Sequence, residues 1–307
     1  MEKEYDLVII GGGCAGYPAA IYASRFNLKT LVIAKEMGGL ITTTHLVENY
    51  PGFISLSGPE LASKLEEHVK ANNVEILNDI VNSVEKLKNG KFVIKTDINE
   101  YEIESKAIVL ATGTKHRHLD APGEKEFSSK GVSYCATCDG NFFRNKEVVI
   151  VGGSDSAAKE AMVLSQVCSK VTMLVRSKLK AEPINIERIK KIENVEILEG
   201  VQIKEIKGDK KVNSVLLDNG DEMQVSGVFI AVGMLPQNEI AKSLGVELNK
   251  KGEVIIDKLS TTNVKGVFAA GDLTDAPWKQ GIVAAAEGSI AGYSAFEYIN
   301  SKFGDDN

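Results

Sequence analysis

Two cysteines stand at a spacing that suits redox chemistry, because residues 135–138 read Cys-Ala-Thr-Cys. This spacing brings both sulfur atoms within disulfide reach across one turn. The chain has four cysteines in all, and Cys14 and Cys168 lie alone in apolar, helix-like stretches, where a cysteine is typically a small buried hydrophobe. No second Cys-x-x-Cys or histidine pair at ligand spacing completes a zinc site. Cys135 and Cys138 are therefore predicted to form a redox-active dithiol rather than a metal site or a structural disulfide.

An acidic residue, Asp139, directly follows the pair. Thiol–disulfide exchange needs one sulfur as a thiolate and a proton for the sulfur that leaves. Asp139 is the candidate acid/base for that proton. The alternative is that Asp139 and Gly140 form a turn, which is a common use of an Asp-Gly pair.

A glycine-rich turn near the start of the chain, Gly11–Gly16, indicates a dinucleotide site. It follows an apolar run at 5–10 and precedes an alanine-rich helical stretch and a second strand at 29–34. In a Gly-x-Gly-x-x-Gly turn the glycines allow a tight bend and a close approach to a pyrophosphate, which the helix N-terminus attracts. Glu36 lies where such sites carry an acid for a ribose hydroxyl, although a loop glutamate can also be merely solvated.

The same strand, turn and helix pattern recurs in the middle of the chain. A strand-like run at 147–151 leads into Gly152, Gly153, Ser154, Asp155 and Ser156, and a helical run and another strand at 171–175 follow. Two such units indicate two nucleotide-binding domains rather than a solenoid repeat.

Composition agrees with this organisation. The chain has 307 residues, 43% hydrophobic and 25% charged, which at roughly 150 residues per domain indicates two globular domains. A net charge of −6 and only 6% aromatic residues argue against a nucleic-acid partner. No apolar run reaches the length of a membrane span, and the acidic N-terminus lacks the features of a signal peptide, so a cytoplasmic location and no membrane partner are expected.

Together these features resemble the low-molecular-weight thioredoxin reductases, which are FAD-containing pyridine nucleotide-disulfide oxidoreductases. A Cys-x-x-Cys-Asp inside the second nucleotide domain distinguishes this family from the glutathione-reductase type, whose cysteines lie near the N-terminus. The resemblance runs essentially end to end and is carried by residues 11–16, 37–44, 48–52, 111–113, 134–140, 232–236, 267–272 and 279–280.

The resemblance implies an α/β fold of two Rossmann-like, three-layer domains, the second inserted into the first. Residues 1–114 and 245–307 would form the FAD domain, and residues 115–244 a pyridine-nucleotide-type domain that carries the dithiol. Rotation of the inserted domain is also implied, with hinges near 114–117 and 238–245.

The resemblance also assigns roles to residues. Cys138 would be the sulfur on the flavin side, Cys135 the thiol that attacks the partner's disulfide, and Asp139 the acid/base. The implied cofactor-binding residues of the FAD domain are Gly11, Gly13, Cys14, Ala15, Gly16, Glu36, Gly39, Leu40, Asn49, Val81, Ala111, Thr112, Gly113, Gly271, Asp272, Lys279, Gln280, Gly281 and Ile282. Those of the inserted domain are Gly152, Gly153, Ser154, Asp155, Ser156 and Arg176.

The implied activity is electron transfer from NADPH or NADH through FAD and the dithiol to a thioredoxin- or glutaredoxin-like protein, by a homodimer. Three departures from the family pattern concern the cofactor sites: Leu40 stands where glutamine is common, Ser154 where the second glycine is usual, and Arg176 alone where NADPH-using members carry His-Arg-Arg. Lys178 and Lys180 follow closely. The donor therefore stays open between NADPH, NADH, and reduced ferredoxin or a deazaflavin. A redox-sensing flavoprotein is a further alternative.

Overall fold

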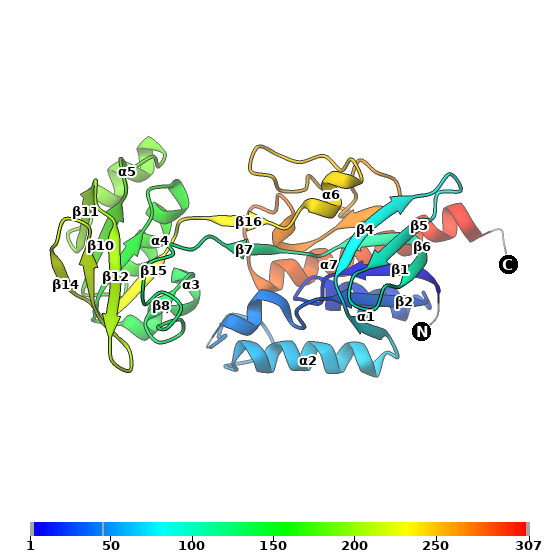
Figure 1. The fold of residues 1–307 in the computed structure, drawn as a ribbon, viewed down its shortest axis with the longest axis horizontal. Helices are drawn as coiled ribbons and strands as arrows, with labels where there is room; N and C mark the ends of the chain where they lie inside the picture. Colours follow the sequence, from blue (N-terminus) through cyan, green and yellow to red (C-terminus); the bar gives the residue numbers. More distant parts are fainter. Residues whose placement is uncertain (1–2, 45, 305–307) are drawn as a thin grey trace. The chain divides into compact units, whose positions relative to one another are not determined.

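The computed structural model describes residues 3–44 and 46–304, and the chain divides into two compact units (Figure 1). Residues 1–115 and 235–307 form the first unit, and residues 116–234 form the second. The return to the first unit comes ten residues earlier than the expected boundary at 244–245. The reason is α6 (Glu239–Ser243), whose Ala241 is buried in the core of the first unit.

The first unit is built on a seven-stranded sheet in the order β3-β2-β1-β6-β5-β4, with β17 also paired to β6. The central strands are parallel and buried on both faces, which explains their continuous apolar sequences. The strands are β1 (Glu4–Ile10), β2 (Thr30–Ala34), β3 (Glu75–Asn78), β4 (Val81–Lys86), β5 (Phe92–Thr96), β6 (Glu102–Leu110) and β17 (Val267–Ala269).

Two helices of the first unit pack at unusually short range. The helices are α1 (Gly16–Arg25) and α7 (Gly281–Phe303). A Cβ at Gly288 would overlap the carbonyl oxygen of Ala15, just before α1, and a Cβ at Gly292 would overlap that of Ala19 in α1. Glycine at both positions therefore lets the helices touch backbone to backbone. The remaining helical segments are α2 (Gly58–Ala71), η1 (Gly39–Thr43) and η3 (Gly271–Leu273).

The second unit has a five-stranded parallel sheet in the order β11-β10-β9-β15-β8 and a smaller antiparallel sheet, β12-β13-β14. One buried cluster lies between the parallel sheet and the helices, and another lies between the two sheets. Both units are thus layered α/β structures, as expected. The elements are β8 (Val132–Ser133), α3 (Ala136–Asp139), η2 (Gly140–Phe143), β9 (Glu147–Val151), α4 (Asp155–Ser165), β10 (Lys170–Val175), α5 (Pro183–Lys190), β11 (Val195–Glu199), β12 (Ile203–Gly208), β13 (Val212–Leu217), β14 (Glu222–Gln224) and β15 (Gly227–Ile230).

The chain passes between the units at two short strands that pair with each other, β7 (Thr114–His116) and β16 (Met234–Pro236). Across the part of the chain that the structure describes, no helix combines the length and the apolar character of a membrane span.

The α1–α7 contact can be tested by adding one methyl group. Gly288→Ala would place a Cβ against the Ala15 backbone, which cannot move away as a flexible side chain can, so the free energy of unfolding should fall by about 1–3 kcal/mol. Gly304→Ala is the matched control, because nothing lies within 4 Å of that added Cβ. Urea denaturation followed by circular dichroism measures both variants. Equal midpoints for Gly288→Ala and Gly304→Ala would contradict the close contact.

Candidate active site

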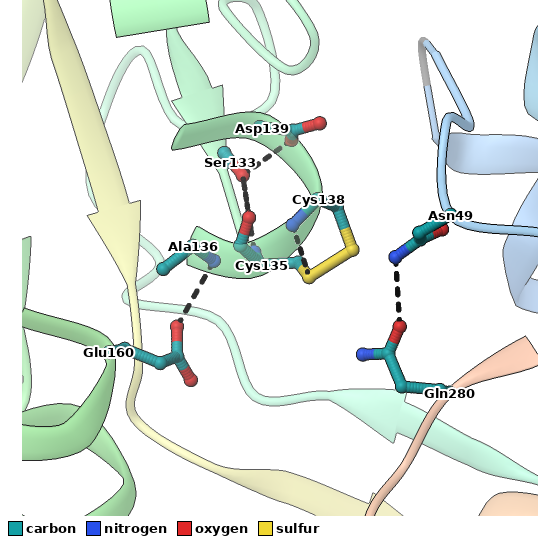
Figure 2. The surroundings of a disulfide bond; sticks show 8 residues. All are labelled: Asn49, Ser133, Cys135, Ala136, Cys138, Asp139, Glu160 and Gln280. Atoms are coloured by element: carbon teal, nitrogen blue, oxygen red, sulfur yellow. Dashed lines mark hydrogen bonds between the residues drawn. A yellow bond between two sulfur atoms is a disulfide. The ribbon is translucent and has the colours of Figure 1, made fainter. Parts of the chain in front are cut away.

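The two cysteines at 135 and 138 form a disulfide bond at the start of α3, with their Cα atoms 5.3 Å apart (Figure 2). The structure thus confirms the pairing predicted from their spacing. Cys135 is the N-cap of α3, and its Sγ accepts a hydrogen bond from the Cys138 backbone N–H at 3.2 Å. An N–H that points at this sulfur favours its thiolate form once the disulfide is reduced.

Asp139 is held by a hydroxyl rather than by the following turn. Ser133, a buried residue of β8, donates from Oγ to Asp139 Oδ2 at 2.6 Å and accepts from the Cys135 backbone N–H at 3.1 Å (Figure 2). The Asp139 side chain makes no capping hydrogen bond to the 3-10 turn that follows it, which disfavours the purely structural alternative. Ser133 therefore links the acid to the backbone of the first cysteine.

A second carboxyl reaches the dithiol loop from α4. Glu160 accepts a hydrogen bond from the Ala136 backbone N–H at 3.3 Å, and burial raises the pKa of Glu160 to about 7 (Figure 2). The sequence analysis missed this residue. Its signal is position: Glu160 follows Ala157 by three residues and precedes Leu164 by four, so a charged side chain lies on the buried face of the helix.

The first glycine turn contains glycines that are needed for two different reasons. A Cβ at Gly11 would overlap the Ala111 carbonyl oxygen, and a Cβ at Gly16 would overlap that of Gly11, so the turn itself requires both. At Gly13 the nearest atom to an added Cβ, the Gly38 carbonyl oxygen, would be 3.5 Å away, which is an ordinary contact. The fold leaves that space open, as expected where a pyrophosphate approaches the backbone.

Several predicted cofactor residues of the first unit gather around this turn. A Cβ added to Gly39 would lie 3.3 Å from Gly13 Cα, so Gly39 is close to the turn. A Cβ added to Gly271 would lie 2.8 Å from Ala15 Cβ, and one added to Gly281 would lie 3.5 Å from Cys14 Sγ. The turn, η1, η3 and the start of α7 are therefore neighbours.

Asp272 carries a largely buried carboxylate. Among the described residues nothing donates a hydrogen bond to its side chain, and burial raises the pKa of Asp272 while the nearby Lys279 charge lowers it. A largely buried carboxylate of this kind is suited to accept hydrogen bonds from a bound ligand.

The segment that carries Asp272 is fixed by Glu287 on α7, which the sequence analysis also missed. Glu287 Oε2 accepts from the Gly271 backbone N–H at 2.8 Å and from Thr274 Oγ1 at 3.0 Å. Burial raises the pKa of Glu287, opposed by these two hydrogen bonds.

Other predicted residues of this unit form hydrogen bonds within the protein or lie elsewhere in the unit. Thr112 Oγ1 donates to the Gln237 carbonyl oxygen at 2.6 Å, and Asn49 Nδ2 donates to Gln280 Oε1 at 3.1 Å. Glu36 is exposed after β2, and the Val81 side chain packs half-buried against the core on β4.

The second glycine turn differs from the first in chemistry. Ser154 is the N-cap of α4, where its Oγ accepts from the Ala157 backbone N–H at 3.3 Å and lies 2.9 Å from Ser156 Oγ. The Asp155 carboxylate is bound by Asn185, by the Glu182 backbone N–H and by Lys159 at 2.8 Å, and these interactions hold the pKa of Asp155 at about 2.

The cations expected near a nucleotide follow β10. Arg176, Lys178 and Lys180 are all exposed. The Lys180 backbone N–H donates to the Gly153 carbonyl oxygen at 2.7 Å, which brings this segment next to the second glycine turn.

Comparison with known proteins places this geometry in a family. Residues 5–288 match the family described as pyridine nucleotide-disulphide oxidoreductase. Thioredoxin reductase of Bacillus subtilis is 41% identical over 306 residues, which cover 97% of this chain and 96% of that protein. NADH dehydrogenase of the same organism is 37% identical over 97% of this chain, but this chain spans only 59% of its length.

A solved structure agrees with the curated relatives. The crystal structure of thioredoxin reductase from Streptococcus pyogenes superimposes with a TM-score of 0.92 at 38% identity, covering 98% of this chain and 100% of that one. A family match over most of the chain, a relative of the same length and a disulfide at the expected position agree. The chain therefore belongs to the pyridine nucleotide-disulphide oxidoreductase family and, within it, groups with the low-molecular-weight thioredoxin reductases.

Proposed function

We propose that the protein is a thioredoxin-disulfide reductase. It takes two electrons from a reduced nicotinamide nucleotide and passes them through FAD and the dithiol to the disulfide of a thioredoxin- or glutaredoxin-like protein. The observation that carries the proposal is the disulfide between Cys135 and Cys138, with the next residue, Asp139, linked through the Ser133 hydroxyl to the Cys135 backbone N–H. A homodimer in the cytoplasm, where such a dithiol stays exchangeable, completes the proposal.

The first unit would hold the FAD. FAD supplies reversible two-electron transfer between the nucleotide and the disulfide. The open backbone at Gly13 and the N-terminus of α1 would receive the pyrophosphate, and the Asp272 carboxylate would accept hydrogen bonds from hydroxyl groups. The N-terminus of α7, at Gln280 and Gly281, would favour negative charge on the reduced flavin.

The chain's own residues carry out the exchange step. In the reduced protein the Cys135 thiolate attacks one sulfur of the partner's disulfide, forming a mixed disulfide and releasing the other sulfur, which takes a proton from Asp139. Cys138, losing its proton to Asp139, then attacks Cys135 and releases the partner's second sulfur, which takes that proton from Asp139 and leaves as a thiol. The partner disulfide is reduced by two electrons and the Cys135–Cys138 disulfide is re-formed.

The second unit would hold the nicotinamide nucleotide, with Arg176 facing the 2′-phosphate of NADPH. One specific observation favours a second candidate donor, reduced ferredoxin or a deazaflavin. Ser154 fills the position of the usual second glycine, and its hydroxyl caps α4.

The flavin proposal can be tested through Gly13. Gly13→Ala should fold normally, because the added methyl meets only ordinary contacts, but should lose most of its bound FAD, because the methyl fills the space left for the pyrophosphate. Flavin absorbance per protein and circular dichroism measure the two properties. Gly16→Ala is the contrast, because it should impair folding itself. A Gly13→Ala protein with full FAD content would remove the pyrophosphate from this turn.

The dithiol assignment is tested by single replacements. Cys135→Ser and Cys138→Ser should each lower thioredoxin-dependent turnover by at least about a thousandfold, as loss of a catalytic nucleophile does. Reduction of the flavin by its donor should persist in both variants. Cys168→Ala, which removes a buried thiol of the same unit, should leave turnover unchanged. Retained turnover in either serine variant would contradict the assignment.

The nucleotide assignment is tested by the KM values for NADPH and NADH. Arg176→Ala should raise KM for NADPH by roughly 10- to 150-fold, the equivalent of losing one charge-assisted hydrogen bond, and that for NADH much less. Arg188→Ala, an exposed arginine on α5, is the control and should change neither. Equal effects of Arg176→Ala on both nucleotides would exclude a 2′-phosphate contact. No flavin reduction by either nucleotide would favour the non-nucleotide donor.

A further inference from the structure

Two carboxyls contact the dithiol loop, and the exchange step uses only one of them. Glu160 bonds the Ala136 backbone N–H at 3.3 Å, in the peptide that joins Ala136 to Cys135. This is the only hydrogen bond of the Glu160 side chain among residues 3–44 and 46–304. The carboxyl therefore has one neutral donor and no cation.

The position of Glu160 on α4 explains why it lacks a counter-ion. Its neighbours on the inner face are Ala157, Ala161 and Leu164, all fully buried. Asp155 and Lys159 of the same helix pair with each other at 2.8 Å.

The elements packed against α4 provide no counter-ion either. On α3, the Asp139 carboxylate is bonded to Ser133. On β10 and β11, Lys170 pairs with Glu196 at 2.8 Å. The remaining charged groups on β9, α5 and β11 are exposed: Glu147, Glu187, Arg188, Lys190 and Glu199.

A largely buried carboxyl in such surroundings binds a proton readily. Removing a carboxylate from water without a cation disfavours its charged form, and for Glu160 this raises the pKa to about 7, against a smaller lowering by the Ala136 N–H. The charge state of Glu160 is thus poised to respond to a nearby negative charge.

We propose that Glu160 is a positioning residue for the dithiol, which orients the Cys135–Ala136 peptide and takes up a proton when the disulfide is reduced. The inference rests on the proposed function, because it concerns the same dithiol cycle. Two electrons from the donor break the Cys135–Cys138 bond. One sulfur takes a proton and the other stays a thiolate, and Asp139 takes up the proton that it later donates to the partner. A further proton goes from solvent to the Glu160 carboxylate. When the thiolate is consumed by attack on the partner, Glu160 releases its proton.

Reduction of the disulfide and protonation of Glu160 are coupled only in a defined pH range. The thiolate raises the pKa of Glu160 further, because like charges in a poorly screened interior repel. Below about pH 7, Glu160 is protonated in both redox states and adds nothing. Just above that pH, reduction takes up the extra proton, so the oxidation–reduction equilibrium depends more steeply on pH than that of an isolated dithiol.

The test measures the dithiol directly in the full-length protein. The oxidised and reduced forms are equilibrated with dithiothreitol redox buffers from about pH 6 to about pH 8.5, trapped by alkylation and counted by mass spectrometry. Glu160→Gln keeps an acceptor for the Ala136 N–H but cannot titrate. We expect the equilibrium constant for reduction of Glu160→Gln by dithiothreitol to change less with pH than that of the native protein. Above pH 7 the two slopes should differ by up to tenfold per pH unit, or ~30 mV. Glu160→Asp should retain part of the steeper slope.

A second measurement covers the thiol itself. Without the carboxylate, the Cys135 thiol should ionise at lower pH, so the alkylation rate of reduced Glu160→Gln should reach its half-maximum at lower pH than in the native protein. Glu187→Gln removes an exposed charge from the same unit and should match the native protein in both measurements.

An unchanged slope together with an unchanged alkylation profile in Glu160→Gln would overturn the proposal. If reduction of the native dithiol takes up no extra proton above pH 7, the proposal is overturned even if Glu160→Gln does not fold. Neither measurement uses thioredoxin or a nucleotide. Failure of the proposed function would therefore show in turnover, whereas failure of this inference would show in the dithiol alone.

Discussion

The backbone contact between α1 and α7 determines the arrangement of the candidate cofactor site. Because Gly288 and Gly292 carry no side chain, α7 lies directly on the first turns of α1. The same helix supplies Glu287, which fixes the segment before Asp272, and its N-terminus lies beside Cys14. A wider helix spacing would separate the glycine turn from Asp272 and from the start of α7 at once. The packing of α7 on α1 therefore sets the positions of the glycine turn, the Asp272 segment and the start of α7 together.

The dithiol depends on a different kind of support, which comes from hydrogen bonds to backbone N–H groups. Ser133 and Glu160 accept from the backbone nitrogens of Cys135 and Ala136, and Cys135 Sγ accepts from that of Cys138. These three hydrogen bonds hold a very short helix that has little stability of its own. Two carboxyls with different partners are thereby attached to the loop that carries both sulfurs.

The sequence predicted those features that depend on local spacing. The apolar runs, the two glycine turns and the cysteine pair each lie within a few residues, and the structure has all of them. Features set by distant contacts were not predicted. The packing of residues 235–244 with the first unit could not be predicted locally, because the burial of Ala241 depends on strands far away in the chain. Glu160 and Glu287 act on residues 24 and 16 positions away, and only their place on buried helix faces hints at their contacts.

The two glycine turns show how the demands of the fold can be separated from those of a ligand. At the first turn, steric overlap explains Gly11 and Gly16 but not Gly13, whose Cβ would have ordinary contacts. At the second turn, the position corresponding to Gly13 is Ser154, and there a side chain is not only tolerated but caps the helix. The turn can therefore fold with a side chain at this position. Since no steric reason within the chain explains glycine at 13, the simplest reason is a bound group that must approach the backbone closely. At the second turn, either no group approaches as closely, or the Ser154 hydroxyl binds the group.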